Sequence, residues 1–272
     1  MFNNLYISAL LTPSASSAAS KTAAGSSGSV LLPGNLLIFQ KSENVFGFSS
    51  GNFEDMELET LSSPITIHQL MNHTSGLTYG AFDPGPVGRV MRKSQIDFGN
   101  TNESLGDLVD RLSKTPLCFQ PGSSWRYGVS TDVLGRILEV ITGKNLGQVL
   151  RRRIFDPLKM SDTSFSVPDT KVDKFCALYT KTNERSLKKL EDAENSRFRE
   201  PVSMNSGGGG LVSSMRDYVT FVEMIRGLGA SDGARVLGRK TVDFMMRNHL
   251  PGDMASMGQN NNDNNNSNYC QE

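Results

Sequence analysis

The feature that most constrains the fold is an amphipathic pattern that follows the chain's single tryptophan. After the polar stretch SSWRYGV, apolar residues recur at the spacing that puts them on one face of a helix: Leu134, Ile137, Leu138 and Ile141. Ser130 or Thr131 is expected to cap the start of this helix, and Gly143 to end it. A second helix over 146–154 follows closely and stops before Pro157. The short connection predicts that these two helices pack together.

Further segments also predict regular structure. Residues 35–50 carry apolar and aromatic runs on both sides of the polar KSEN, which favours a β-hairpin. One helix is expected to start at Thr66 and stop near Gly76, and another over 103–115 to end before Pro116. A third is expected to begin with Ser214 and Asp217 as a capping box, and its apolar face would consist of Tyr218, Phe221, Met224 and Ile225.

Other segments lack such patterns. Residues 81–101 hold several Gly and Pro and are predicted to form a loop. Residues 181–200 are almost wholly polar and predict a solvated excursion. The run Gly207–Gly210 predicts a tight backbone passage, because glycine permits close approach. Trp125 is expected in the core.

Charge balance and cysteine pattern argue against several classes of protein. Lys plus Arg and Asp plus Glu each total 28, so nothing favours nucleic acid or an anionic membrane as a partner. No apolar run reaches the roughly 18 residues that a membrane-spanning helix needs. No Cys-x-x-Cys pair occurs, which indicates free thiols in a reducing compartment at Cys118, Cys176 and Cys270. The oligomeric state stays open.

The two ends of the chain differ from its middle. Residues 1–32 are rich in Ser and Ala, which leaves a disordered start, an organelle-targeting leader and a secretory signal as alternatives. Residues 258–272 are Asn-rich and predicted to be disordered. One domain is therefore expected over 33–257. The compartment is unknown, and a cytoplasmic or organellar location is favoured over secretion.

Several common chemistries find no support in the sequence. The three histidines, His68, His73 and His249, lack the spacing of a metal-binding helix, so no metal is predicted. The glycine run matches neither phosphate-binding nor dinucleotide-binding loops, and no cofactor is predicted. A Gly-x-Ser-x-Gly nucleophile elbow does not occur, which argues against an α/β-hydrolase.

Four phrases in order carry a resemblance to a known family. ITIHQLMNHTSGL, PGSSWRYGVSTDVLGRILEVITGK, IFDPLKMSDTSF and GGGGLVSSMRDYVTF are similar to segments of the serine β-lactamase and penicillin-binding-protein-like family, in the branch of class C β-lactamases and related esterases and transesterases. The resemblance spans about 64–250. It implies an α+β fold of the β-lactamase/transpeptidase type, with the helical part largely present and the antiparallel sheet partly missing.

The resemblance also implies one catalytic residue, Tyr127. This tyrosine stands where the family has a Tyr-x-Asn-like loop, and Val129 replaces the Asn, a departure that resembles the esterase branch. A tyrosine that acts as a base near neutrality needs its pKa lowered by about 3 units, which nearby cations can supply. The implied substrate is a small-molecule ester, amide or β-lactam-like compound.

Two other family motifs have no evident counterpart. Only Leu61, Ser62 and Ser63 separate GNFEDMELET from PITI, where the resemblance implies a Ser-x-x-Lys helix. A formal match at Ser186–Lys189 falls in the polar excursion, and His249 is followed by Leu and Pro where His-x-Gly is expected. We therefore expect impaired acyl transfer through an acyl-serine. The alternatives are a catalytically inactive binding or assembly protein, or an incomplete gene product.

Overall fold

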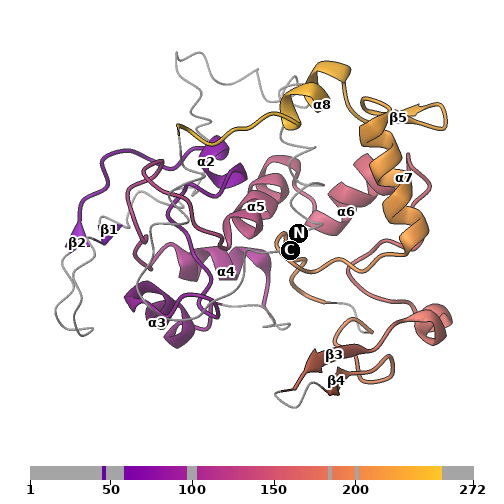
Figure 1. Ribbon diagram of the computed structural model, residues 1–272, viewed down its shortest axis with the longest axis horizontal. Coiled ribbons are helices and arrows are strands. Elements are labelled where there is room, and N and C mark those ends of the chain that lie inside the picture. Colours follow the sequence, from indigo (N-terminus) through magenta and orange to yellow (C-terminus); the bar gives the residue numbers. More distant parts are fainter. Residues whose placement is uncertain (1–44, 47–57, 97–102, 183–185, 200–201, 253–272) are drawn as a thin grey trace.

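The computed structural model of the chain describes residues 45–46, 58–96, 103–182, 186–199 and 202–252 (Figure 1). Their elements follow in this order: β1 (Val45–Phe46), β2 (Leu58–Glu59), α2 (Ile67–Met71), α3 (Pro86–Lys93), α4 (Leu105–Leu112), α5 (Ser130–Thr142), α6 (Leu146–Leu150), a π-helical turn (Arg151–Phe155), a 3-10 helix (Asp169–Lys174), β3 (Leu178–Lys181), β4 (Leu187–Glu191), α7 (Met215–Arg226), β5 (Ala230–Ser231), β6 (Ala234–Arg235) and α8 (Arg239–Met245). The described strands form three separate two-stranded antiparallel sheets, β1–β2, β3–β4 and β5–β6. Helices therefore dominate, in agreement with the predicted α+β class.

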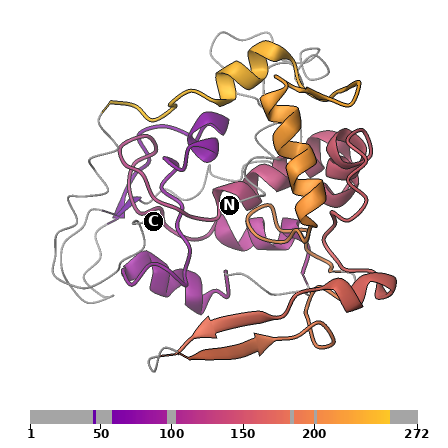
Figure 2. The same cartoon turned by 45° about the vertical axis from the view of Figure 1, so that its right-hand side comes forward.

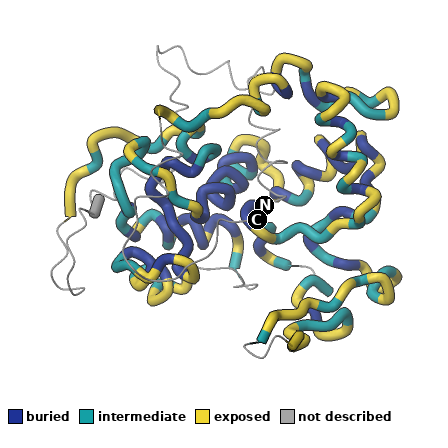
Figure 3. Tube along the Cα trace, viewed as in Figure 1, coloured by how far each residue is buried: buried dark blue, intermediate teal, exposed yellow. Residues whose placement is uncertain are grey.

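Helix α5 lies at the centre of the core, where it contacts α2, α4 and α6. Leu134, Ile137 and Leu138 are buried as predicted, and most of α5 is coloured as buried in Figure 3. The prediction was wrong for Ile141, whose exposed fraction is 43%. The last turn of α5 is partly or fully exposed, so the apolar stripe continues beyond the buried part of the helix.

The two ends of α5 differ in how well the sequence predicted them. Gly143 closes the helix in the left-handed conformation, with φ of 65°, which confirms its predicted role. The predicted cap was wrong: the N-cap is Val129, which makes no side-chain cap, and Ser130 and Thr131 lie inside the first turn. The Ser130 hydroxyl is 2.9 Å from that of Ser75 and hydrogen-bonds to it. Tertiary contact has replaced local capping here.

Helix α2 begins as predicted but ends earlier. Thr66 and Gln69 form a reciprocal capping box. The helix stops at Met71, because the Asn72 side chain accepts hydrogen bonds from the backbone and hydroxyl of Thr74 and turns the chain. Gly76, predicted to end the helix, instead has φ of 87° and lies so close to Phe119 that a Cβ there would be 2.5 Å from the carbonyl oxygen.

Two segments predicted to be irregular contain regular elements. Residues 81–101 include α3, because Pro86 occupies the first turn, where proline is tolerated, and Val87 and Met91 are buried. The polar segment 181–200 contributes to the β3–β4 hairpin, which extends from the rest of the molecule in Figures 1 and 2 and is largely exposed. The hairpin predicted over 35–50 lies mostly outside the described residues.

Helix α7 confirms its predicted start in part. The Ser214 hydroxyl accepts a hydrogen bond from the Asp217 amide, as in a capping box. The buried Asp217 carboxylate, however, accepts from the Asp162 amide at 2.7 Å and from the Thr163 hydroxyl at 2.9 Å. It thus ties α7 to the loop after the π-helical turn, while Phe221 on the same helix is fully buried.

Truncations on α5 test this packing. We expect Leu134→Ala to lower the free energy of unfolding by about 2–5 kcal/mol, because it leaves a cavity in the core. Ile141→Ala, an exposed truncation on the same helix, should change it by less than about 0.5 kcal/mol. Urea denaturation followed by circular dichroism measures both, and similar losses for the two variants would contradict the observed burial.

Candidate functional site

Tyr127 lies in the loop before α5 and packs against the segment 73–79. The Arg126 amide donates to the His73 carbonyl at 3.0 Å, and a Cβ on Gly128 would be 2.4 Å from the Leu77 carbonyl oxygen. The Tyr127 ring lies 5.1 Å from the His73 ring and 5.2 Å from the Tyr79 ring, between centroids. Its exposed fraction is 36%, so the loop presents a supported phenol to solvent.

Trp125, two residues earlier, does not lie in the core as predicted. Its exposed fraction is 40%, and its ring contacts that of His73 edge-on at 6.3 Å. The indole is therefore only partly covered.

A buried carboxylate lies beneath this loop in the first turn of α5. Asp132 accepts hydrogen bonds from the Ser206 hydroxyl at 2.6 Å and from the Gly208 amide at 3.2 Å. It also hydrogen-bonds to the Gly207 amide and to the Tyr79 hydroxyl. Burial raises the pKa of Asp132, although these hydrogen bonds oppose the shift.

The glycine run reaches this cluster because it has no side chains. A Cβ on Gly208 would be 2.4 Å from the Tyr79 hydroxyl and 2.7 Å from Oδ2 of Asp132, distances that no real Cβ can occupy. The predicted tight backbone passage is therefore confirmed at Gly208. The sequence reasoning missed Asp132 and Tyr79; the one available signal was an acidic residue in the first turn of the predicted helix.

The electrostatic surroundings of Tyr127 are the reverse of those expected. Burial raises the pKa of the phenol, and the negative charge of Asp132 raises it further, while the hydrogen bond between Tyr79 and Tyr127 opposes the shift. Arg126, the adjacent cation in the chain, pairs with Asp83 at 3.2 Å. Within the described part of the chain, Tyr127 thus has a neighbouring anion where the base mechanism needs a cation.

His73 is held in an unusual state beside the phenol. It adopts a left-handed backbone conformation with φ of 60°, and its ring is buried against Trp125 and Tyr127. Burial lowers the pKa of His73 to about 4, because charging the imidazole there would cost its hydration. The ring is therefore neutral near pH 7.

The formal Ser-x-x-Lys match does not form a site. Ser186 directly precedes β4 and Lys189 lies within it, and residues three apart in an extended strand point to opposite faces, whereas a helix would bring them together. The Ser186 hydroxyl hydrogen-bonds to Thr182 at 2.7 Å, and Lys189 pairs with Asp192 at 3.1 Å. Both side chains are committed within the exposed hairpin.

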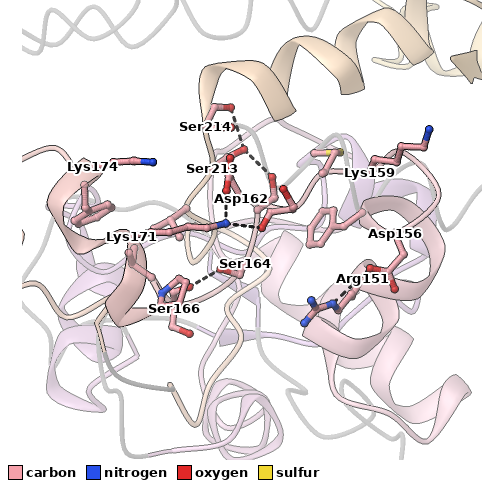
Figure 4. Close-up of a pocket in the computed structure, with 18 residues that line it drawn as sticks. Arg151, Asp156, Lys159, Asp162, Ser164, Ser166, Lys171, Lys174, Ser213 and Ser214 are labelled. Atoms are coloured by element: carbon pink, nitrogen blue, oxygen red, sulfur yellow. Dashed lines mark hydrogen bonds and ion pairs between the residues drawn. The ribbon is translucent and has the colours of Figure 1, made fainter. Parts of the chain in front are cut away.

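A cavity of about 820 Å³ lies elsewhere, between the π-helical turn and the start of α7 (Figure 4). Two of its four lining cations are paired: Lys171 pairs with Asp162, and Arg151 lies 3.5 Å from Asp156. Tyr127 is not among the residues that line it. The volume of this cavity therefore says nothing about a substrate site at the phenol.

The described residues also bear on metals, thiols and membranes. No three His, Cys, Asp or Glu side chains in these ranges are grouped so that they could hold a metal ion. Cys118 and Cys176 are free thiols, as predicted, and Cys270 lies outside the described residues. None of the described helices has the length and apolar character that crossing a bilayer requires.

Comparisons with known proteins bear on the family and the fold of the chain. A family model described as beta-lactamase matches residues 59–262. Lovastatin esterase of Penicillium rubens is 31% identical over 71% of this chain and 46% of its own length. EstCE1, a hydrolase with promiscuous acyltransferase activity, has a TM-score of 0.60 and 27% identity, covering 73% of this chain and 54% of its own. Unliganded simvastatin synthase of Aspergillus terreus has a TM-score of 0.61 at 23% identity over 80% of this chain and 51% of its own, which bears on the fold alone.

The chain spans less than half the length of the curated relatives that it matches.

The buried histidine predicts a pH dependence of stability. Below the unfolded pKa of 6.5, the unfolded chain binds a proton at His73 that the folded chain does not bind until about pH 4. Stability should therefore fall as the pH falls from 6.5 to 4, by about 3 kcal/mol in total from this group.

Urea denaturation at pH 7 and pH 4.5 measures this loss. His73→Asn, which tolerates the left-handed backbone, should lose much less stability between the two pH values than the wild type does. His68→Asn, which removes an exposed imidazole, is the control and should behave as wild type. If His73→Asn lost as much stability between the two pH values as the wild type does, the loss could not be assigned to His73.

Proposed function

The chain belongs to the beta-lactamase family, and on this premise we propose that its site serves esterase- or transesterase-type acyl transfer on small-molecule esters, with Tyr127 as the proton-transferring residue. One relative is named as an esterase of lovastatin, and EstCE1 is described as a hydrolase that also transfers acyl groups. The observation that carries the proposal is the half-exposed Tyr127 phenol, supported by His73 and Tyr79 at the start of α5. Val129 two residues later favours esters over β-lactams.

Acyl transfer through an acyl-serine needs more than this phenol. It requires an activated nucleophile and donors that stabilise the oxyanion. We propose that activity is impaired in the chain as written. In support, only three residues separate β2 and its flank from Pro64, and one of them, Ser62, is hydrogen-bonded to Gln120 at 3.0 Å. Between Thr60 and Pro64 no Ser-x-x-Lys sequence stands.

A non-catalytic role in binding or assembly is the second candidate. The raised pKa of Tyr127 favours it, because a phenol that stays protonated binds a ligand by hydrogen bonding without abstracting a proton. The two candidates differ in one measurable property, which is whether ester turnover depends on Tyr127.

Ester hydrolysis tests the proposal. With p-nitrophenyl butyrate we expect slow turnover that falls about tenfold or more in Tyr127→Phe, because general acid–base groups contribute at least that much. Tyr179→Phe, which removes an exposed hydroxyl on β3, should leave the rate unchanged. We expect a fluorophosphonate probe to give no stoichiometric serine label. Stoichiometric labelling would contradict impairment, and a Tyr127→Phe rate equal to wild type would contradict the role of Tyr127.

A further inference from the structure

Tyr79 connects the exposed phenol to the buried carboxylate. Its side chain is 1% exposed, its hydroxyl hydrogen-bonds to both Asp132 and Tyr127, and its ring packs on that of Tyr127. The hydroxyl lies against Gly208, on the same side as Oδ2 of Asp132. Three polar groups thus form a continuous line from the protein interior to the surface.

The direction of these hydrogen bonds follows from counting protons. A phenol has one proton to donate, while its oxygen can also accept. Asp132 is surrounded by the backbone amides of Gly207 and Gly208, which can only donate, and by the Ser206 hydroxyl, so its partners suit an ionised carboxylate. The Tyr79 proton is therefore directed to Asp132. The Tyr79 oxygen is then left to accept the proton of Tyr127.

We propose that Asp132 and Tyr79 form a proton relay for Tyr127, with Asp132 as the terminal acceptor. When an alcohol or serine hydroxyl meets the phenol, its proton passes to the Tyr127 oxygen as its electron pair attacks the acyl carbon. The original Tyr127 proton moves to Tyr79, and the Tyr79 proton moves to Asp132, so that the positive charge transferred neutralises the carboxylate. The reverse sequence returns a proton to the leaving group. Its use in acyl transfer rests on the proposed function.

The relay removes the requirement for a preformed phenolate. Tyr127 stays neutral throughout, so an adjacent anion is compatible with proton transfer, whereas it would oppose a phenolate base. Burial also makes Asp132 a stronger proton acceptor than an exposed carboxylate, since its pKa is raised. Tyr79 and Asp132 are positioning residues in this scheme, because they act through Tyr127.

Among the described residues, two other titratable groups lie near the phenol, His73 and Arg126. His73 packs on the ring and is neutral above about pH 4, and Arg126 is paired with Asp83. His73 therefore keeps its charge state through the alkaline range where a tyrosine titrates. A change in the alkaline titration of Tyr127 can therefore be assigned to Tyr79 or Asp132.

A double-mutant cycle on the pKa of Tyr127 tests the relay without any substrate. The protein is labelled with 3-fluorotyrosine, whose fluorine lowers the phenol pKa, and ¹⁹F NMR resonances are assigned with single Tyr→Phe variants. Asp132→Asn should lower the pKa of Tyr127 by about one unit, because it removes a nearby negative charge. In a Tyr79→Phe background the same substitution should lower it by less than half as much, because the hydroxyl that couples the two groups is gone.

Equal shifts in both backgrounds would overturn the relay, since they would reflect charge acting through space alone. No shift in either would overturn it as well. If Asp132→Asn does not fold, Ser206→Ala keeps the carboxylate and removes one of its donors. The Tyr127 pKa should then rise with Tyr79 present and stay constant in Tyr79→Phe; any other pattern contradicts the relay.

The exposed Tyr179 supplies the internal control, and its resonance should titrate alike in every variant. Failure of the relay and failure of the proposed function are distinguishable. Coupled titration without ester turnover would leave the relay standing and reject the activity, whereas Tyr127-dependent turnover with uncoupled titration would do the opposite.

Discussion

The arrangement of the site depends on the hydrogen bonds that the buried carboxylate of Asp132 accepts. It lies in the first turn of the central helix α5 and receives donors from the glycine run and from Tyr79. An ionised group without partners in such a position would cost several kcal/mol, so these donors must stay in place for the fold to form. One carboxylate thereby fixes three segments that are far apart in the sequence.

The same carboxylate governs the chemistry open to Tyr127. A mechanism that begins with a phenolate needs a cation to lower the pKa of Tyr127, whereas burial and the charge of Asp132 raise it, against the opposing effect of the Tyr79 hydrogen bond. A phenol backed by Tyr79 and Asp132 can transfer a proton without ionising first. The geometry thus suits proton relay or hydrogen-bond donation at a site that still needs a nucleophile from an alcohol or serine.

Several residues around the Tyr127 phenol hold it in place without supplying a charge. His73 is buried and neutral near pH 7, so it contributes a ring surface and an unusual backbone turn rather than a charge. Gly128 and Gly208 let two backbone segments approach closely where side chains would collide. The cavity beside Lys171 and Asp162 does not include Tyr127 in its lining, so it lies apart from the proposed site.

The sequence by itself determined the family and most of the helices, α3 excepted, because both are encoded in local patterns. The apolar period of α5, its closing Gly143, the capping box at Thr66 and the position of Tyr127 before α5 depend on residues that are neighbours in the chain. Only the tertiary structure decided that Tyr79, Asp132 and Gly208 meet, since no local spacing links them and the contact exists only once α5 has packed. The same holds for the pKa of Tyr127. The sequence gives the tyrosine and its ordinary pKa, whereas the burial and the neighbouring Asp132 that raise this pKa arise only from packing.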